Sequence, residues 1–148
     1  MNPELVDTWQ IHQRIMLYFL DALSDEQLGA RAAKGKSVRE QLAHVHNVRL
    51  MWLKSAAPEL LEPLGKLDDE TPRDALRSAL LESGKAIESL VEQSAGRVKG
   101  FKPHTSAFVG YLVAHESSHR GQAELILRLE GMPLDDSVGY GIWQWGVR

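Results

Sequence analysis

The sequence predicts an all-α protein, a four-helix bundle with an aromatic C-terminal tail. Apolar residues recur at helical spacing in four long segments, and no segment is convincing as a β-strand. Helix start and stop signals flank most of these segments. Amphipathic helices must bury their apolar faces together, which favours a bundle. With 148 residues and 43% hydrophobic content, residues 1–148 are expected to form one domain.

The first half of the chain contains two of the long helices. The first is expected from Pro3 to Ala22, because proline suits a first helical turn. A capping-box pattern at Ser24 predicts a short helical turn, and a second one at Ser37 opens a helix that continues to about Lys54. Apolar residues cover more than one face of this second helix. It is therefore expected to be buried between neighbours or against another subunit.

A connector separates the first two long helices from the third. Residues 55–70 contain prolines and glycine, and this length allows a crossover. Thr71 is the expected N-cap of the third helix, with Pro72 at its first position and an end near Gln93. This helix carries no evident chemistry and is interpreted as packing.

The fourth helix is expected from about Ser106 to Glu130, with Thr105 or Ser106 as its cap. Gly131 and a following proline end it. Residues 134–148 hold several aromatic residues among glycines. We expect this tail to pack onto the bundle or onto a partner subunit.

Composition excludes several classes of function. A net charge of −3 with scattered basic residues gives no footprint for nucleic acid. The chain has no cysteine, which excludes disulfides, thiolate nucleophiles and cysteine zinc sites. No signal-peptide pattern is present at the start and no apolar run approaches the roughly 18 residues of a membrane span. A cytoplasmic protein with no membrane partner is the expectation.

The strongest candidate for chemistry is a pair of histidines on the fourth helix. His115 and His119 are four residues apart and share one helical face, so they can present two nitrogens to one metal ion. Both interrupt a stripe that is expected to point into the core. The stripe consists of Phe108, Tyr111, Leu112, His115, His119, Gln122, Ile126 and Leu129. Because a buried imidazole must satisfy its ring nitrogens, metal binding is favoured over two separately hydrogen-bonded histidines.

A third histidine is available on the second helix. His44 and His46 lie about 200° apart around the axis, so only one of them can face the pair. Helical periodicity alone does not decide between them. Three neutral imidazoles would leave a coordination position open, as in catalytic rather than structural sites.

These motifs resemble those of the DinB-like or YfiT-like four-helix metalloproteins. The resemblance rests on Leu42-Ala43-His44 with Trp52 eight residues later, on residues 115–122, and on the segment Gly139 to Trp145. It spans nearly the whole chain. The resemblance implies that His44, His115 and His119 are the metal ligands.

The resemblance also implies a divalent ion such as zinc or nickel, and commonly a homodimer. Characterised relatives include S-transferases and isomerases that use low-molecular-weight thiols. The expected function is transfer of such a thiol to a small electrophilic substrate. The expected mechanism is Lewis-acid activation, in which the ion lowers the pKa of a thiol or water at its open position.

Two other functions remain open from the sequence. His115-Glu116-Ser117-Ser118-His119 matches the His-Glu-x-x-His pattern of zinc peptidases, with Glu116 as a catalytic base. The metzincin continuation is absent beyond His119, so a solvated or inter-helix role is favoured for Glu116, although a metal-dependent hydrolase is still compatible. Alternatively, the protein is not an enzyme and the metal only braces the bundle.

The remaining polar residues near these motifs have simpler interpretations. His12 is expected to be a packed, hydrogen-bonded histidine, and His104 a surface loop residue. Gly121 is interpreted as permitting close approach of a helix. Arg120 and Gln122 are candidates for bracing ligands or contacting substrate.

Overall fold

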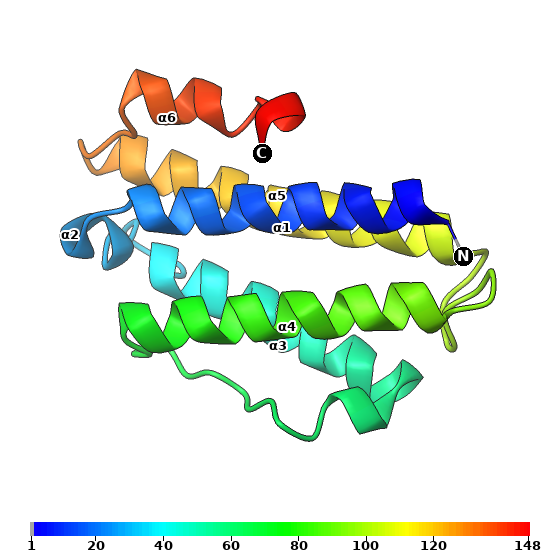
Figure 1. Ribbon diagram of the computed structural model, residues 1–148. Coiled ribbons are helices and arrows are strands. Elements are labelled where there is room, and N and C mark those ends of the chain that lie inside the picture. The colour runs from blue at the N-terminus through cyan, green and yellow to red at the C-terminus, as the bar shows by residue number, and fades with distance from the viewer. Residues whose placement is uncertain (1) are drawn as a thin grey trace.

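The computed structural model describes residues 2–148 and is helical throughout (Figure 1). Within these residues the only β-type pairing is an isolated bridge between Arg31 and Ser37. No helix in this part of the chain is long and apolar enough to cross a membrane. The elements are α1 (Pro3–Ala22), α2 (Asp25–Leu28), α3 (Val38–Ala56), η1 (Pro58–Leu60), α4 (Arg73–Gln93), α5 (Thr105–Leu129), α6 (Asp136–Gly141) and η2 (Trp145–Val147).

The four long helices form the predicted bundle. Helix α1 packs against α4 and α5, and α3 packs against the same two helices from the other side. Arg73, at the start of α4, donates hydrogen bonds to the carbonyls of Leu20 and Leu23 at the end of α1, so these helices are antiparallel. Arg39, at the start of α3, donates to the carbonyl of Thr71 just before α4, so α3 and α4 are parallel.

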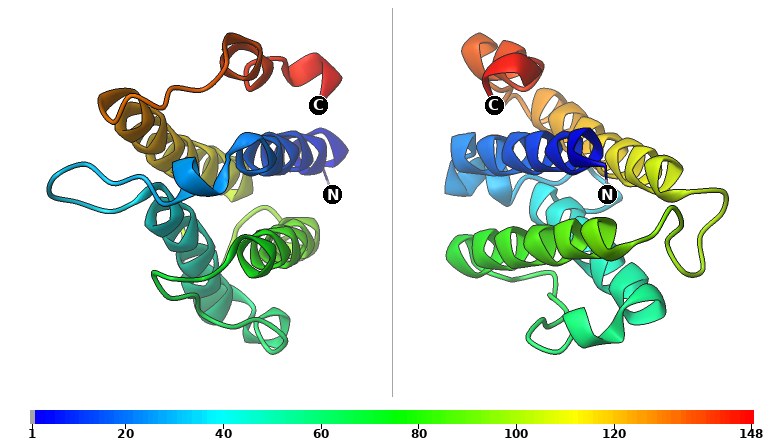
Figure 2. Two further views of the ribbon diagram at one scale, coloured as in Figure 1. Left: turned by 90° about the vertical axis from the view of Figure 1, so that its left-hand side faces the viewer. Right: turned by 45° about the vertical axis from the view of Figure 1, so that its right-hand side comes forward.

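The parallel pair requires the connector to return along the bundle. Residues 57–72 run back along the outside of α3 and α4, on the opposite side of the molecule from the C-terminal segment (Figures 1 and 2). Asn47 fixes this connector because its side-chain amide exchanges two hydrogen bonds with the backbone of Leu67, at 3.0 and 2.9 Å. The connector therefore makes the crossover that its length allows.

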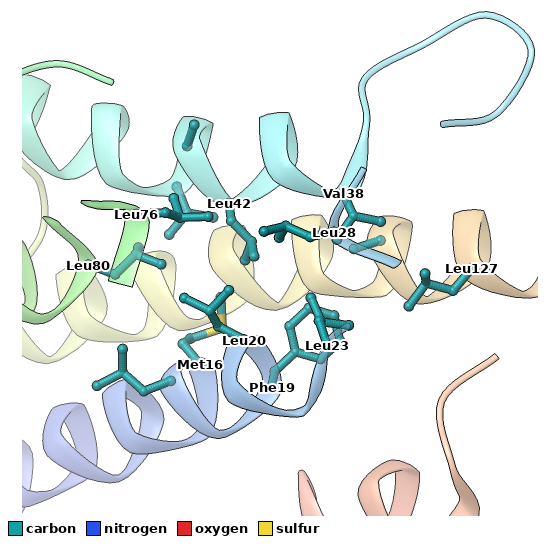
Figure 3. Close-up of a cluster of buried hydrophobic side chains, with 14 of the residues drawn as sticks. Met16, Phe19, Leu20, Leu23, Leu28, Val38, Leu42, Leu76, Leu80 and Leu127 are labelled. Atoms are coloured by element: carbon teal, nitrogen blue, oxygen red, sulfur yellow. The ribbon is translucent and has the colours of Figure 1, made fainter. Parts of the chain in front are cut away.

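One hydrophobic core lies where α1, α3, α4 and α5 meet. Leu20 and Met16 from α1 face Leu42 from α3 and Leu80 from α4, and all four side chains are fully buried (Figure 3). A second cluster fills the other end of the bundle around Trp9. Burial of these residues gives the helices a fixed rotation, which determines the direction of every polar side chain near the core.

Most helix ends agree with the sequence, and two caps were predicted wrongly. The capping boxes at Ser24 and Ser37 are both present. The N-cap of α4 is Pro72, whose side chain has no atom that accepts a hydrogen bond. Helix α5 is capped by His104, whose Nδ1 accepts from the amide of Ala107 at 3.0 Å. A ring nitrogen two bonds from Cβ reaches that amide as a Ser or Thr hydroxyl would.

The C-terminal tail packs on the bundle, as predicted. Ile142 is buried in the core cluster, and the Arg148 guanidinium lies 3.9 Å from the centre of the Tyr18 ring. Two aromatic side chains of the tail, Tyr140 and Trp143, are exposed. The tail is thus only partly covered by its own chain.

Candidate metal centre

Helices α3 and α5 bring three histidines together. The ring of His44 lies 5.5 Å from that of His115 and 4.5 Å from that of His119, and the last two are 4.7 Å apart, measured between ring centres. One nitrogen from each ring lies within 4.8 Å of the others. All three side chains are half-buried. The structure therefore places together the three residues that the family resemblance selected.

The histidines lie at the edge of the core and not in its middle. On α5 the residues that face the centre of the bundle include Glu116 and Arg120, each one position after a histidine. The predicted stripe is therefore right in part: Phe108, Leu112 and Ile126 are buried, but Tyr111 and Leu129 are exposed. This rotation leaves the imidazoles reachable from solvent, as a site that binds small molecules requires.

Gln41 orients one of the three rings. Its Oε1 lies 2.6 Å from Nδ1 of His119, and its Nε2 donates to Oε1 of Gln122 at 3.1 Å. An amide oxygen only accepts, so Nδ1 of His119 carries the proton and donates it. In a neutral imidazole this leaves Nε2 with a free lone pair, which is the state that a metal ligand needs.

All three imidazoles are held in the neutral form at pH 7. Burial, followed by the charges of His115, His44 and Lys36, lowers the pKa of His119 to about 4. Burial and the charges of Lys36 and His115 lower the pKa of His44, and burial lowers that of His115. The rings thus disfavour protonation of one another, which is the usual behaviour of like charges in close proximity.

This donor set fits a divalent transition metal. Nδ1 of His115 is buried and has no hydrogen-bond partner among residues 2–148, which is costly for a polar atom unless something else binds it. Nitrogens that share one tetrahedral zinc lie about 3.3 Å apart, given Zn–N bonds of about 2.0–2.1 Å. The 4.8 Å limit leaves at most about 1.5 Å to close, within reach of rotations of half-buried rings.

Glu116 points into the centre of the bundle, about 100° around α5 from His115. Nε of Arg49 donates to its Oε2 at 2.8 Å, and a second guanidinium nitrogen donates to Oε1 at 2.6 Å. Nε2 of His12 lies 3.0 Å from the same Oε1. All three side chains are completely buried. This geometry favours the inter-helix role of Glu116 and gives no support to the catalytic role, since no free oxygen faces solvent.

Burial and ion pairing act on Glu116 in opposite directions. Burial alone raises the pKa of the carboxyl, but the charge and hydrogen bonds of Arg49, together with His12, lower it to about 2. Glu116 is therefore an anion at every physiological pH. An anion with such a low pKa is a weak base, which further disfavours general-base catalysis.

The other residues singled out from the sequence lie away from the cluster. His46 is buried and its Nε2 lies 2.8 Å from the carbonyl of Gly65, so it attaches α3 to the connector. His12 is packed and hydrogen-bonded, as predicted. Gly121 is exposed and no other side chain would meet an added Cβ there, so its predicted close-packing role is wrong. Arg120 is buried with its guanidinium 5.9 Å from the Trp143 ring.

The roles of two important residues escaped the sequence analysis. Gln41 lies three positions before His44, and this helical spacing on one face was the available signal. Arg49 is the one charged residue between Gln41 and Leu53 of its helix, which indicates a buried partner. Neither signal names the partner, because both partners come from the distant helix α5.

Comparison with known proteins agrees with this arrangement. No curated protein shows significant similarity to the chain. The family model described as "DinB family" matches residues 1–135, a region that contains all three histidines and the four long helices. The chain therefore belongs to the DinB family.

Proposed function

We propose that the protein is a metal-dependent enzyme that transfers a low-molecular-weight thiol to a small electrophilic substrate. The observation that carries the proposal is the convergence of His44, His115 and His119, three neutral imidazoles from two helices, at a half-exposed position. Zinc and nickel are the ions that we propose for this all-nitrogen donor set.

The accessibility of the cluster supports a catalytic rather than a structural ion. Structural zinc sites have four protein ligands, whereas catalytic sites have three and keep one position open. His44 forms part of the wall of a pocket of about 710 Å³, so a small molecule can approach the cluster. No other His, Cys, Asp or Glu of residues 2–148 completes the group.

The residues of the chain each have a role in this proposal. His119 is held by Gln41 in the tautomer that exposes Nε2, and His44 and His115 are kept neutral by burial. Tyr111 stacks beside His115 with 6.2 Å between ring centres and limits its rotation. A bound divalent ion supplies Lewis-acid activation, which lowers the pKa of a thiol and makes it nucleophilic near neutral pH.

The absence of cysteine is consistent with a thiol that arrives as a cosubstrate. No side chain of this sequence can supply a sulfur nucleophile, because the chain has no cysteine. Hydrolysis by activated water uses the same three ligands and remains the alternative. A peptidase would need Glu116 as its general base, but Glu116 is bound by Arg49 inside the bundle.

A conjugation assay tests the proposed reaction. Protein loaded with zinc or nickel is mixed with a panel of small thiols and the electrophile monochlorobimane, and the rate is compared with that of chelator-treated protein. We expect metal-dependent acceleration that disappears in His44→Ala and persists in His104→Ala, whose histidine only caps α5. Equal rates with and without metal for every thiol would refute a thiol transferase.

We also propose that the protein forms a homodimer through α5 and the C-terminal tail. Tyr140 and Trp143 are 74% and 70% exposed, and Leu125 and Leu129 of α5 are exposed as well. Large exposed apolar side chains that gather in one region mark association surfaces. Light scattering should give the dimer mass, and Trp143→Glu should give the monomer mass. A monomeric unmodified protein at micromolar concentration would contradict the proposal.

A further inference from the structure

A pocket lies beside the three histidines, between the exposed side of α3 and the returning connector. Its volume is about 710 Å³. His44 contributes to its wall, so the pocket reaches one of the three imidazoles. The hydrogen bonds of Asn47 with Leu67 and of His46 with Gly65 hold the connector against α3 and thereby fix the shape of the pocket.

Three lysines give this pocket a positive charge. Lys36, Lys54 and Lys66 line it, against two carboxylates, Glu40 and Asp69. Glu40 is already paired with Arg31 outside the pocket. Within residues 2–148, none of the three lysines has a carboxylate at ion-pair distance. The pocket is therefore locally basic although the whole chain carries a net charge of −3.

Lys36 lies close enough to the imidazoles to act on them. Its charge is among the causes that lower the pKa of His44 and of His119. Lys36 directly precedes Ser37, the N-cap of α3, so its position is set by the start of that helix. Lys66 is held near the middle of α3 because its neighbour Gly65 is bonded to His46. Lys36 thus lies near His44, and Lys66 lines the same pocket from the connector.

The rest of the pocket is apolar. Val48 and Met51 on α3 face Leu61 and Leu64 of the connector, and Met51 is 56% exposed. An exposed methionine in a pocket wall is a flexible surface that adapts to different apolar groups. A pocket with cationic groups in one part and apolar side chains along the rest is complementary to a molecule that has an anionic group at one end and an apolar part at the other.

We propose that this pocket binds an organic anion whose negative group lies against Lys36 and Lys66 and whose apolar part extends along α3 past Met51. The proposal rests on the proposed function, because it makes this anion the thiol cosubstrate. Lysine ammonium groups act as point charges and accept carboxylate and phosphate alike. The proposal therefore specifies the charge of the ligand and not the kind of anionic group. The thiol must carry its negative group a few bonds from the sulfur.

Two matched probes test the assignment by binding. The acid 3-mercaptopropionate and the alcohol 3-mercapto-1-propanol have equal carbon chains and differ in charge. Isothermal titration calorimetry with metal-loaded protein should give tighter binding of the acid than of the alcohol. A higher salt concentration should weaken the binding of the acid alone. The double substitution Lys36→Gln and Lys66→Gln should lower the affinity for the acid by about ten-fold and leave the affinity for the alcohol unchanged. The control is Lys99→Gln, an exposed lysine in the loop before α5.

The outcomes separate this assignment from the metal site. Metal content is measured for each variant and should stay unchanged. If the acid binds equally well to the double variant, its carboxylate contacts something other than the lysines, and the assignment is overturned. Failure of the acid to bind the unmodified protein overturns it as well. If the protein binds no metal, the proposed function fails, while the same titration on the protein as purified still decides whether the lysines select the acid.

Discussion

Arg49 and Glu116 form a bidentate ion pair at the centre of the bundle, with neither side chain exposed to solvent. The same guanidinium donates to the carbonyl of Leu80 at 2.9 Å and to Oγ of Ser83 at 3.2 Å, both on α4. Glu116 directly follows His115, and Arg49 lies five residues after His44. The ion pair therefore fixes the rotation of α3 and α5 that lets their histidines converge.

Removing one member of this pair should be strongly destabilising. Glu116→Gln leaves the Arg49 charge buried without an anion, which costs about 3–5 kcal/mol of unfolding free energy. Replacing both residues with apolar ones, Arg49→Met with Glu116→Leu, should recover much of the loss. Urea denaturation measures both. Arg77→Ala, which breaks an exposed pair with Asp21, is the control and should cost below about 1 kcal/mol. A fully stable Glu116→Gln protein that lost activity would instead support a catalytic Glu116.

The same carboxylate predicts how stability depends on pH. The folded pKa of about 2 lies below the ordinary value of 4.5, so the unfolded chain binds the extra proton first as pH falls. The stabilisation is complete above pH 4.5 and is lost between pH 4.5 and about 2. Urea midpoints measured across this range should fall more steeply for the unmodified protein than for Glu116→Gln. Parallel curves would show that Glu116 is not held as an anion by Arg49.

Gln41 should tune metal affinity without being a ligand. Gln41→Leu removes the acceptor that holds the proton on Nδ1 of His119, and loss of such an outer partner typically lowers metal affinity 10–100-fold. Gln41→Glu keeps an acceptor and should retain tight binding. Competition with a chelating dye measures the affinity, and Gln93→Leu at the end of α4 is the control. Unchanged affinity in Gln41→Leu would mean that His119 is not oriented by this bond.

Two glycines inside helices should respond oppositely to alanine. Gly121 on α5 has open space where a Cβ would project, so Gly121→Ala should stabilise the protein by about 0.5–1 kcal/mol. On α4, a Cβ at Gly84 would overlap the amide of Gln13, which is buried and bonded to the carbonyl of Leu80. Gly84→Ala should therefore lower the melting temperature and Gly121→Ala should raise it. A loss of stability in Gly121→Ala would restore the close-packing role expected from the sequence.

The helices themselves could be predicted from the sequence because their signals are local. The first helix was expected from about Pro3 to Ala22, as observed, and the capping boxes at Ser24 and Ser37 depend only on residues three apart. The cap of α5 was missed because His104 performs a task that hydroxyl and carboxamide side chains usually perform. Local rules fail where an unusual side chain satisfies the same backbone group.

The site was predictable only in part, because its decisive contacts join distant segments. The spacing of His115 and His119 indicates a metal pair, but periodicity left His44 and His46 equivalent, and the resemblance to a family was needed to choose. The rotation of α5 was predicted only in part, because the expected stripe contains His115 and His119 and leaves out Glu116 and Arg120, which are buried. Their burial depends on partners such as Arg49, 67 residues away from Glu116 in sequence.

The most direct test of the account is the metal content of the protein and of His44→Ala. After incubation with excess zinc or nickel and removal of free ion, elemental analysis should find one ion per chain in the unmodified protein and in His104→Ala. His44→Ala should retain almost none, while circular dichroism shows that it is still helical. A full equivalent of metal in His44→Ala, or no tightly bound metal in the unmodified protein, would contradict the three-histidine centre.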